Sequence, residues 1–213
     1  MTGGARNAGR VAEVIGAVTR QALADRGGSR IALLDDGGPE AALAASILRD
    51  ALGEHAVVPV DASGFDPGPL PRGSTGDARR VEEELRRVRA RLMDGALAAH
   101  PANKTALLLC GDLPPEPLLP LGDLWATDVL ALCGGWSAPP EVEALARDAG
   151  GIEVLDGALR RLVDARDPSA PESLPGAIAE RVRTMLAAGS AARRYPRIVP
   201  KLGVRTLFAD LYE

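Results

Sequence analysis

The segment Arg30-Ile-Ala-Leu-Leu-Asp-Asp-Gly-Gly-Pro-Glu40 decides the fold, because in it a short apolar run leads directly into a glycine turn. Residues 31–34 are apolar without interruption, which is typical of a strand buried on both faces of a parallel sheet. The Ala- and Leu-rich stretch that follows predicts a helix over about 40–52. A strand, a glycine turn and a helix in this order can bring backbone amides and a helix dipole to a phosphate group.

Three carboxylates surround this turn and complicate that interpretation. Asp35, Asp36 and Glu40 flank the pair Gly37-Gly38. Carboxylates at a phosphate position repel an anion unless a metal ion lies between them. Glycine is also the residue that turns most easily, so a turn of this kind needs no ligand to explain it. The turn alone therefore leaves open whether it binds a nucleotide or only joins two elements.

Helices and strands are predicted to alternate along the rest of the chain. Apolar periodicity marks the helices, and short apolar runs mark the strands. The predicted strands are 31–34, 56–60 and 106–110, and the other predicted helices are 9–25, 78–99, 122–133, 139–149, 151–165 and 174–188. Right-handed crossovers then give an α/β fold: a small parallel sheet sandwiched by helices, with 31–34 as its middle strand and a helical C-terminal part.

The distribution of Gly and Pro, which interrupt helices and strands, indicates the domain organisation. Residues 61–77 hold seven Gly and Pro residues and are expected to form an irregular loop. We expect this loop to lie inside a single α/β domain over 1–202, followed by a C-terminal tail at 203–213.

Composition excludes several classes of protein. The 25 basic and 29 acidic residues give a net charge of -4, which argues against nucleic acid or an anionic membrane as a partner. No apolar stretch reaches the roughly 18 residues that a spanning helix needs. The two cysteines and two histidines show neither a disulfide framework nor zinc spacing. We expect a cytoplasmic protein.

A segment in the second half of the chain resembles a known signature. Pro120-Leu-Gly-Asp-Leu-Trp-Ala-Thr127 is similar to the Pro-Ile/Leu-Gly-Asp-Leu-Tyr-Lys-Thr motif of ammonia-dependent NAD synthetases. Four further segments follow the order of that family: Asp36–Ala41 at its Ser-Gly-Gly-x-Asp-Ser, Arg89–Leu92 at its Arg-x-Arg-Met, Ile152–Leu159 at its Tyr-x-x-Ile-Asp-x-x-Leu, and Arg193–Pro200 at its Lys-Arg-x-x-Pro-x-x-Pro. The resemblance spans about 9 to 202 and implies an adenine-nucleotide α-hydrolase-like fold in a shortened, motif-degenerate member.

The resemblance also implies a nucleotide site with ATP and magnesium as cofactors. Its residues would be Asp36, Gly37, Gly38, Glu40, Asp123, Arg193 and Arg194. The departures from the family pattern argue against both cofactors. The two hydroxyls of the family turn are replaced by Asp36 and Ala41, and the lysine of Tyr-Lys-Thr is Ala126. Transfer of an adenylyl group needs such donors to stabilise phosphate charge, so no catalytic or metal-binding residue is assigned.

The second ATP loop of the family, Gly-Thr-x-Asn-Lys-x-Glu, has two candidate placements. Asn103-Lys104-Thr105 matches it by letters, but this placement leaves no strand between the predicted helix 78–99 and the loop. A strand at 106–110 favours Cys110-Gly111-Asp112 instead, a segment without the lysine or the glutamate.

Three functions remain in view, and whether the chain is an enzyme stays open. The favoured one is a non-catalytic subunit or regulator, paired as a homodimer or as a heterodimer with a full-length NAD-synthetase-like homologue. The second is an ATP-dependent amide ligase for an NAD precursor or another carboxylate, with Asp36, Glu40 and Asp112 as a new metal cluster. The third is an adenine-nucleotide-binding module without chemistry, at Gly37-Gly38.

We predict that the protein forms a dimer or pairs with a homologue. The helix predicted over 78–99 has a broad apolar stripe, and the tail adds Val204, Leu207, Phe208, Leu211 and Tyr212. A two-fold dimer would cover both surfaces and bury well over roughly 1,200 Å² in total. Light scattering at micromolar concentration should give a mass above 22.1 kDa, the mass of one chain. A mass of one chain with no co-purifying partner would contradict the prediction.

Overall fold

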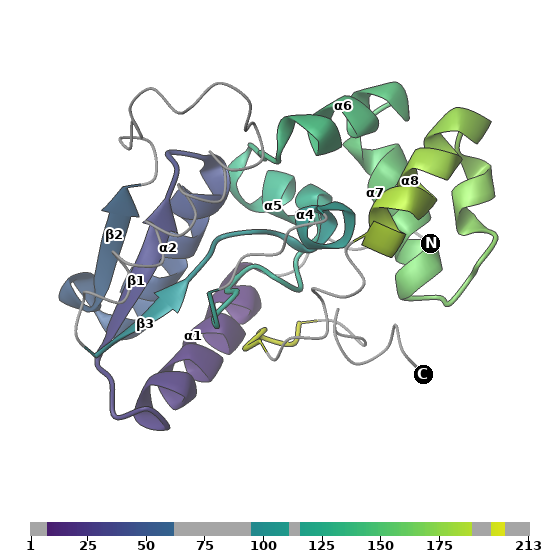
Figure 1. Cartoon of the computed structure of the whole chain (residues 1–213). Coiled ribbons are helices and arrows are strands. Elements are labelled where there is room, and N and C mark those ends of the chain that lie inside the picture. The colour runs from purple at the N-terminus through teal and green to yellow at the C-terminus, as the bar shows by residue number, and fades with distance from the viewer. Residues whose placement is uncertain (1–7, 62–94, 111–115, 189–196, 203–213) are drawn as a thin grey trace, which may run out of the picture.

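The computed structural model describes residues 8–61, 95–110, 116–188 and 197–202. Figure 1 shows a small sheet with helices beside it in the N-terminal half and a group of helices in the C-terminal half. Of the loop predicted over 61–77, Asp61 belongs to a strand and the rest lies outside these residues. The predicted tail at 203–213 also lies outside them, so the proposed domain limits stay predictions.

The sheet has three parallel strands in the order β2-β1-β3. They are β1 (Arg30–Asp35), β2 (Val57–Asp61) and β3 (Ala96–Ala99). Ile31 in the middle strand pairs with Val57 on one side and Leu97 on the other. The prediction of a parallel sheet with 31–34 in the middle is confirmed.

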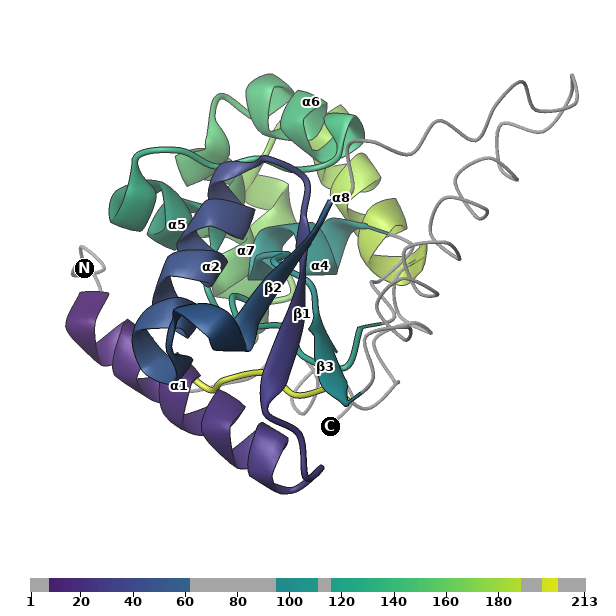
Figure 2. The ribbon, with the colours of Figure 1, turned by 90° about the vertical axis from the view of Figure 1, so that its left-hand side faces the viewer.

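Two helices cover one face of the sheet. They are α1 (Ala8–Ala24) and α2 (Pro39–Leu52), and the short η1 (Glu54–Ala56) leads from α2 into β2. Figure 2 shows both helices on the same side of the strands. Ile15 of α1, Leu33 of β1 and Leu48 of α2 are at most 1% exposed and belong to one apolar cluster.

The strand predicted at 106–110 is wrong. Residues Lys104–Leu109 form helix α4, and Asn103 caps its first turn, with its side-chain oxygen accepting the Ala106 N–H at 3.0 Å. All six residues of this helix are buried. A short apolar run that is buried on every side has no periodicity, so the pattern does not separate a buried strand from a buried helix. The asparagine before the run is the signal that favours the helix.

The predicted helix 78–99 also ends differently. Residues 78–94 lie outside the described part, and Ala96–Ala99 form strand β3. The sequence Ala-Leu-Ala-Ala favours a helix by propensity, but pairing with β1 overrides that preference. A strand therefore does precede Asn103-Lys104-Thr105. The placement of the ATP loop at Cys110-Gly111-Asp112 loses its basis.

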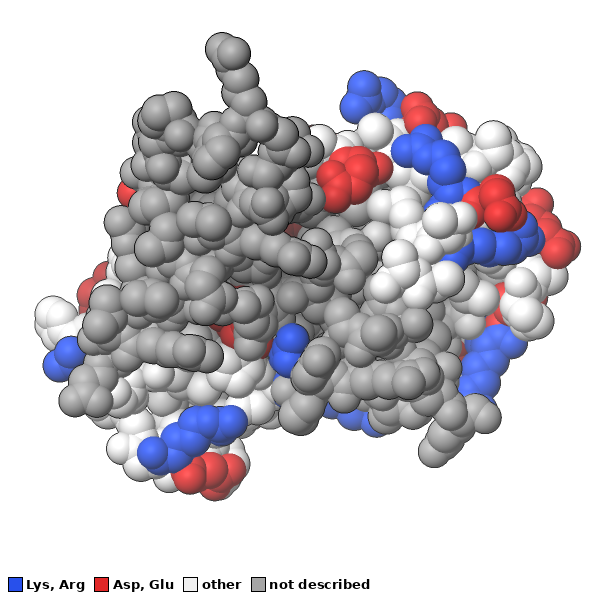
Figure 3. Space-filling model, viewed as in Figure 1, with Lys and Arg blue, Asp and Glu red and all other residues white. Residues whose placement is uncertain are grey.

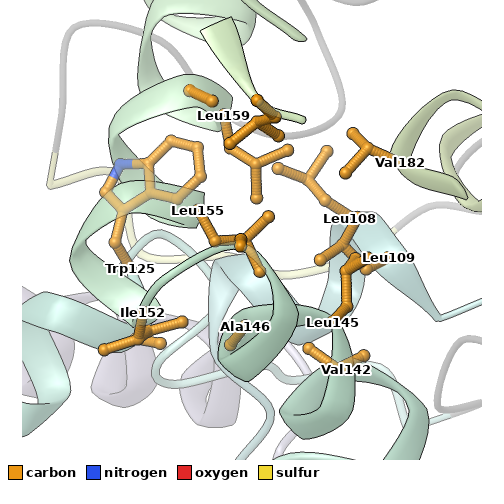
Figure 4. Close-up of a cluster of buried hydrophobic side chains, with 14 of the residues drawn as sticks. Leu108, Leu109, Trp125, Val142, Leu145, Ala146, Ile152, Leu155, Leu159 and Val182 are labelled. Atoms are coloured by element: carbon orange, nitrogen blue, oxygen red, sulfur yellow. The ribbon is translucent and has the colours of Figure 1, made fainter. Parts of the chain in front are cut away.

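The C-terminal half is built from helices around a second apolar core, shown in Figure 4. The helices are α4, α5 (Ala126–Cys133), α6 (Pro140–Asp148), α7 (Ile152–Val163), η2 (Ala170–Ser173) and α8 (Gly176–Ala188). The helix predicted over 122–133 begins later than expected, because the backbone turns first, with the Gly122 N–H donating to Leu119 and the Leu124 N–H donating to Leu121. None of the helices in the described part of the chain is long and apolar enough to cross a membrane.

Single bridges extend the sheet beyond β3. Leu118 forms parallel bridges with Ala99 on one side and Ile198 on the other. The C-terminal segment 197–202 therefore lies beside residues that are about 80 positions earlier in the chain. Gly122 permits close packing here, because a Cβ at this position would lie 3.1 Å from a methyl carbon of Val199.

A matched pair of valines tests the description of the core. Val129 of α5 is fully buried, whereas Val154 of α7 is 46% exposed. We expect Val129→Ala to lower the free energy of unfolding by about 2 kcal/mol, since two buried methyl groups are lost. Val154→Ala should change it by less than about 0.5 kcal/mol. Denaturant unfolding of both variants checks this, and equal effects would contradict the assignment of the core.

Candidate functional site

The turn between β1 and α2 is bonded to its own carboxylates. The Gly37 N–H donates to Asp35 Oδ1 at 3.0 Å, and the Gly38 N–H donates to Asp36 Oδ1 at 2.9 Å. Gly37 has a φ of 76°, a conformation that favours glycine. A Cβ at Gly38 would lie 2.9 Å from both Asp36 Oδ1 and Ser137 Oγ, so only glycine fits there without displacement. The N–H groups of Gly37 and Gly38 are thus paired with carboxylates of the same turn.

Glu40 is the centre of a buried hydrogen-bond cluster beside this turn. Its carboxylate is part of a residue only 4% exposed and accepts the Asn103 amide at 3.0 Å. It also accepts the backbone N–H of Ser137 at 2.9 Å and the Ser137 hydroxyl at 2.6 Å. The carboxylate therefore joins the first turn of α2 to the loops before α4 and before α6. Its place near a helix N-terminus is also favourable for a negative charge.

Lys104 is buried among carboxylates and an indole ring. Its Nζ lies 3.3 Å from Asp123 Oδ1 and 3.2 Å from Asp164 Oδ1, and the lysine side chain is 1% exposed. The same Nζ lies 4.7 Å from the centroid of the Trp125 ring, a distance that allows a cation–π interaction. Asp123 is fully buried, and its second oxygen accepts the Leu202 N–H at 2.7 Å. Asp123 thus acts as a structural link between the ammonium group and the C-terminal segment.

Asp156 of α7 connects its own helix to α4 and α5 through hydrogen bonds. It accepts the Thr105 hydroxyl at 2.6 Å and the Thr127 N–H at 2.8 Å. The Thr105 hydroxyl oxygen in turn accepts the Ala126 N–H at 3.0 Å. Burial raises the pKa of Asp156 above its ordinary value, while these hydrogen bonds and Arg160 act in the opposite direction. The residue connects α4, α5 and α7, which is a supporting role.

The structure brings some of the predicted site residues together. Asp36, Gly37, Gly38 and Glu40 lie at the turn that follows β1, and Asp123 is linked to them through the neighbouring residues Asn103 and Lys104. Arg193 and Arg194 fall outside the described residues.

The sequence analysis considered Asn103 and Lys104, because they match the letters of the family loop, but favoured another placement of that loop. It did not single out Ser137 or Asp164, which also lie in this region.

Carboxylates of the chain occupy the donors of the described part of this site. The amides of the turn and the ammonium group of Lys104 all contact carboxylates of the chain. Within 8–61, 95–110, 116–188 and 197–202, no three His, Cys, Asp or Glu side chains could hold a metal ion together. Asp112, the third member of the predicted metal cluster, is outside these ranges.

Charges of both signs are mixed on the described surface. Figure 3 shows basic and acidic side chains next to each other over the helical half. Arg181 pairs with Asp148 at 2.8 Å, and Arg183 lies 3.7 Å from Glu172. On this face, the described side chains of the helical half form no purely basic patch that would attract an anionic partner.

Two serines test the strength of the Glu40 cluster. The Ser137 hydroxyl donates to a buried carboxylate, whereas the Ser173 hydroxyl donates to a neutral backbone oxygen at 2.6 Å. We expect Ser137→Ala to lower the free energy of unfolding by about 2 kcal/mol and Ser173→Ala by about 1 kcal/mol, since hydrogen bonds to charged groups are stronger. Denaturant unfolding measures both, and a larger effect at Ser173 would contradict this account of the cluster.

Comparison with known proteins supports the fold. No family model matches the chain, and no curated protein matches it. A solved structure that is similar is the NH3-dependent NAD synthetase from Campylobacter jejuni subsp. jejuni NCTC 11168 in complex with the nitrate ion. The two share 14% identity with a TM-score of 0.68, over 91% of this chain and 99% of that chain. The chain therefore has an NAD-synthetase-like α/β fold of the adenine-nucleotide α-hydrolase type.

Proposed function

We propose that the chain is a non-catalytic NAD-synthetase-like protein that retains the scaffold of an amide-forming enzyme without its ATP chemistry. One observation carries the proposal: carboxylates of the chain itself bind the groups that would hold phosphate. Asp35 and Asp36 accept from the turn amides, and Asp123 and Asp164 neutralise Lys104. A nucleotide would have to displace these contacts and then lie among like charges.

The chemistry of adenylation explains why this matters. Attack of a carboxylate on the α-phosphorus of ATP requires positive groups or donors for the phosphates in the transition state. Each such donor is worth roughly 3–4 kcal/mol when it acts there. Ala41 and Ala126 offer no side-chain donor, and Ala106 stands where the family loop has its glutamate, once Asn103-Lys104 takes the loop position.

The proposal includes a partner, since a non-catalytic copy would act through an active one. We propose a homodimer or a heterodimer with a full-length NAD-synthetase-like homologue, on the basis of the resemblance. The sequence suggests 78–99 and 203–213 as the surfaces for this contact. Residues 78–94 and 203–213 lie outside the described part of the chain, and Ala96–Ala99 form strand β3.

We expect calorimetry with ATP and magnesium to show no binding by the full chain. We also expect no release of pyrophosphate in the presence of ATP, magnesium, deamido-NAD and ammonia. The physical reason is the repulsion and the missing donors at the turn. An active NH3-dependent NAD synthetase, assayed in parallel, is the positive control.

The variant Asp36→Ser is the matched comparison for this experiment. It removes the exposed carboxylate bonded to Gly38 and should bind ATP more tightly than the wild-type chain, although still weakly. Pyrophosphate release by the wild-type chain above a heat-killed sample would overturn the proposal in favour of a ligase. Binding without release would instead indicate a nucleotide-binding module.

A further inference from the structure

The loop between α5 and α6, residues 134–139, lies against the start of α2. A Cβ at Gly38 would lie 2.9 Å from Ser137 Oγ, and a Cβ at Gly135 would lie 3.3 Å from Pro39 Cβ. The α5–α6 loop therefore covers the point at which the β1–α2 turn passes into its helix. A ligand could not contact Gly38 on this side without displacing Ser137.

Among the described residues, the hydrogen bonds that join the α5–α6 loop to α2 all end on Glu40. The Ser137 N–H lies 2.9 Å from both Glu40 oxygens, and the Ser137 hydroxyl donates to one of them at 2.6 Å. The other end of the loop bonds to α6, where the Ala138 N–H donates to Glu143 Oε1 at 3.3 Å. One buried carboxylate thus makes the polar attachment to α2, through hydrogen bonds to a charged acceptor, which are the stronger kind.

The loop begins with two glycines and a large aromatic ring. Gly134 ends α5 with a φ of 76°, and Gly135 follows it. Glycine lacks the Cβ that restricts the backbone, so this pair can change direction at low cost. Trp136 is next, and its partly buried ring packs against both apolar clusters, that of the sheet and that of the helical half. Rotation at the glycines would move this ring away from both clusters.

We propose that the α5–α6 loop is a lid, and that Glu40 holds it closed over the β1–α2 turn. While Glu40 accepts the two donors of Ser137, the loop covers Gly38 and Trp136 stays partly buried. When these acceptors are removed, the loop rotates at its glycines and the turn becomes exposed to solvent. This inference does not rest on the proposed function, because it needs only the contacts between the loop and α2.

Glu143 provides the internal comparison. It accepts a hydrogen bond from the same loop, but it is exposed and belongs to α6. Water can replace an exposed acceptor at little cost, so loss of Glu143 should leave the lid closed. The same substitution can therefore be made at both ends of the loop, as Glu40→Met and as Glu143→Met.

Fluorine NMR of the full chain labelled with 5-fluorotryptophan tests the lid. The chain has two tryptophans, Trp125 and Trp136, and Trp136→Phe assigns their signals. The readout is the difference in chemical shift between H2O and D2O, which grows as a ring becomes exposed to solvent. In Glu40→Met this difference should rise for Trp136 towards its value in the urea-unfolded chain, whereas the fully buried Trp125 should keep its wild-type value. In Glu143→Met both signals should keep their wild-type values.

A second variant serves if Glu40→Met does not fold. Methionine has a similar length, but it also removes the acceptor of the Asn103 amide. Ser137→Ala leaves α2 unchanged and removes one of the two loop donors to Glu40. In this variant the Trp136 signal should change in the same direction and to a smaller extent.

Three results would overturn the inference. The first is an unchanged Trp136 signal in folded Glu40→Met or, where that variant does not fold, in Ser137→Ala. The second is an equal change at Trp136 in Glu143→Met, because then Glu40 would have no special part in holding the loop. The third is an equal change at Trp125 and Trp136, because the helical core would then have loosened as a whole.

Discussion

A charge that is buried must meet its counter-charge inside the protein, and Lys104 and Asp123 impose this condition on the fold. Removing one partner of such a pair costs about 3–5 kcal/mol, whereas a well-packed apolar replacement of both is often neutral. The Lys104–Asp123 pair therefore determines which segments of the chain lie together more than it stabilises the fold. Helix α4, the turn before Trp125 and segment 197–202 all meet where these two charges meet.

The same requirement shapes the turn after β1. Glu40 is buried and is satisfied by three donor groups, from Asn103 and from the backbone and hydroxyl of Ser137. The exposed Asp36 instead uses its carboxylate locally, on the next amide but one. Both ends of segment 103–104 are thus held by acidic residues. The position of this segment follows from charge satisfaction as much as from apolar packing.

The sequence predicted β1 and its turn, because an apolar run followed by Asp35, Asp36 and two glycines is a local signal. The alternation of strands and helices predicted a parallel sheet with β1 in the middle. It did not predict β3 or α4. Ala-Leu-Ala-Ala becomes a strand only through pairing with β1, and a run that is buried on all sides carries no period. Within the candidate site, Glu40 was singled out from the motif. Ser137 and Asp164 were not, because they reach their partners across 97 and 60 residues of chain, where no local pattern exists.

On the proposed function, the same substitutions account for a lost activity and a retained fold. A protein that binds a ligand at 100 times its Kd gains about 2.7 kcal/mol of stability from it, and a chain that did not bind would lack this stabilisation. Asp36 accounts for both the lost activity and the retained fold. Its charge repels a phosphate, and its oxygen accepts the Gly38 N–H that a phosphate would otherwise bind. Glu40 acts similarly, because the hydrogen bonds that it accepts from Asn103 and Ser137 join the turn to the loops before α4 and α6. Erosion of this site therefore need not weaken the scaffold that an active partner would recognise.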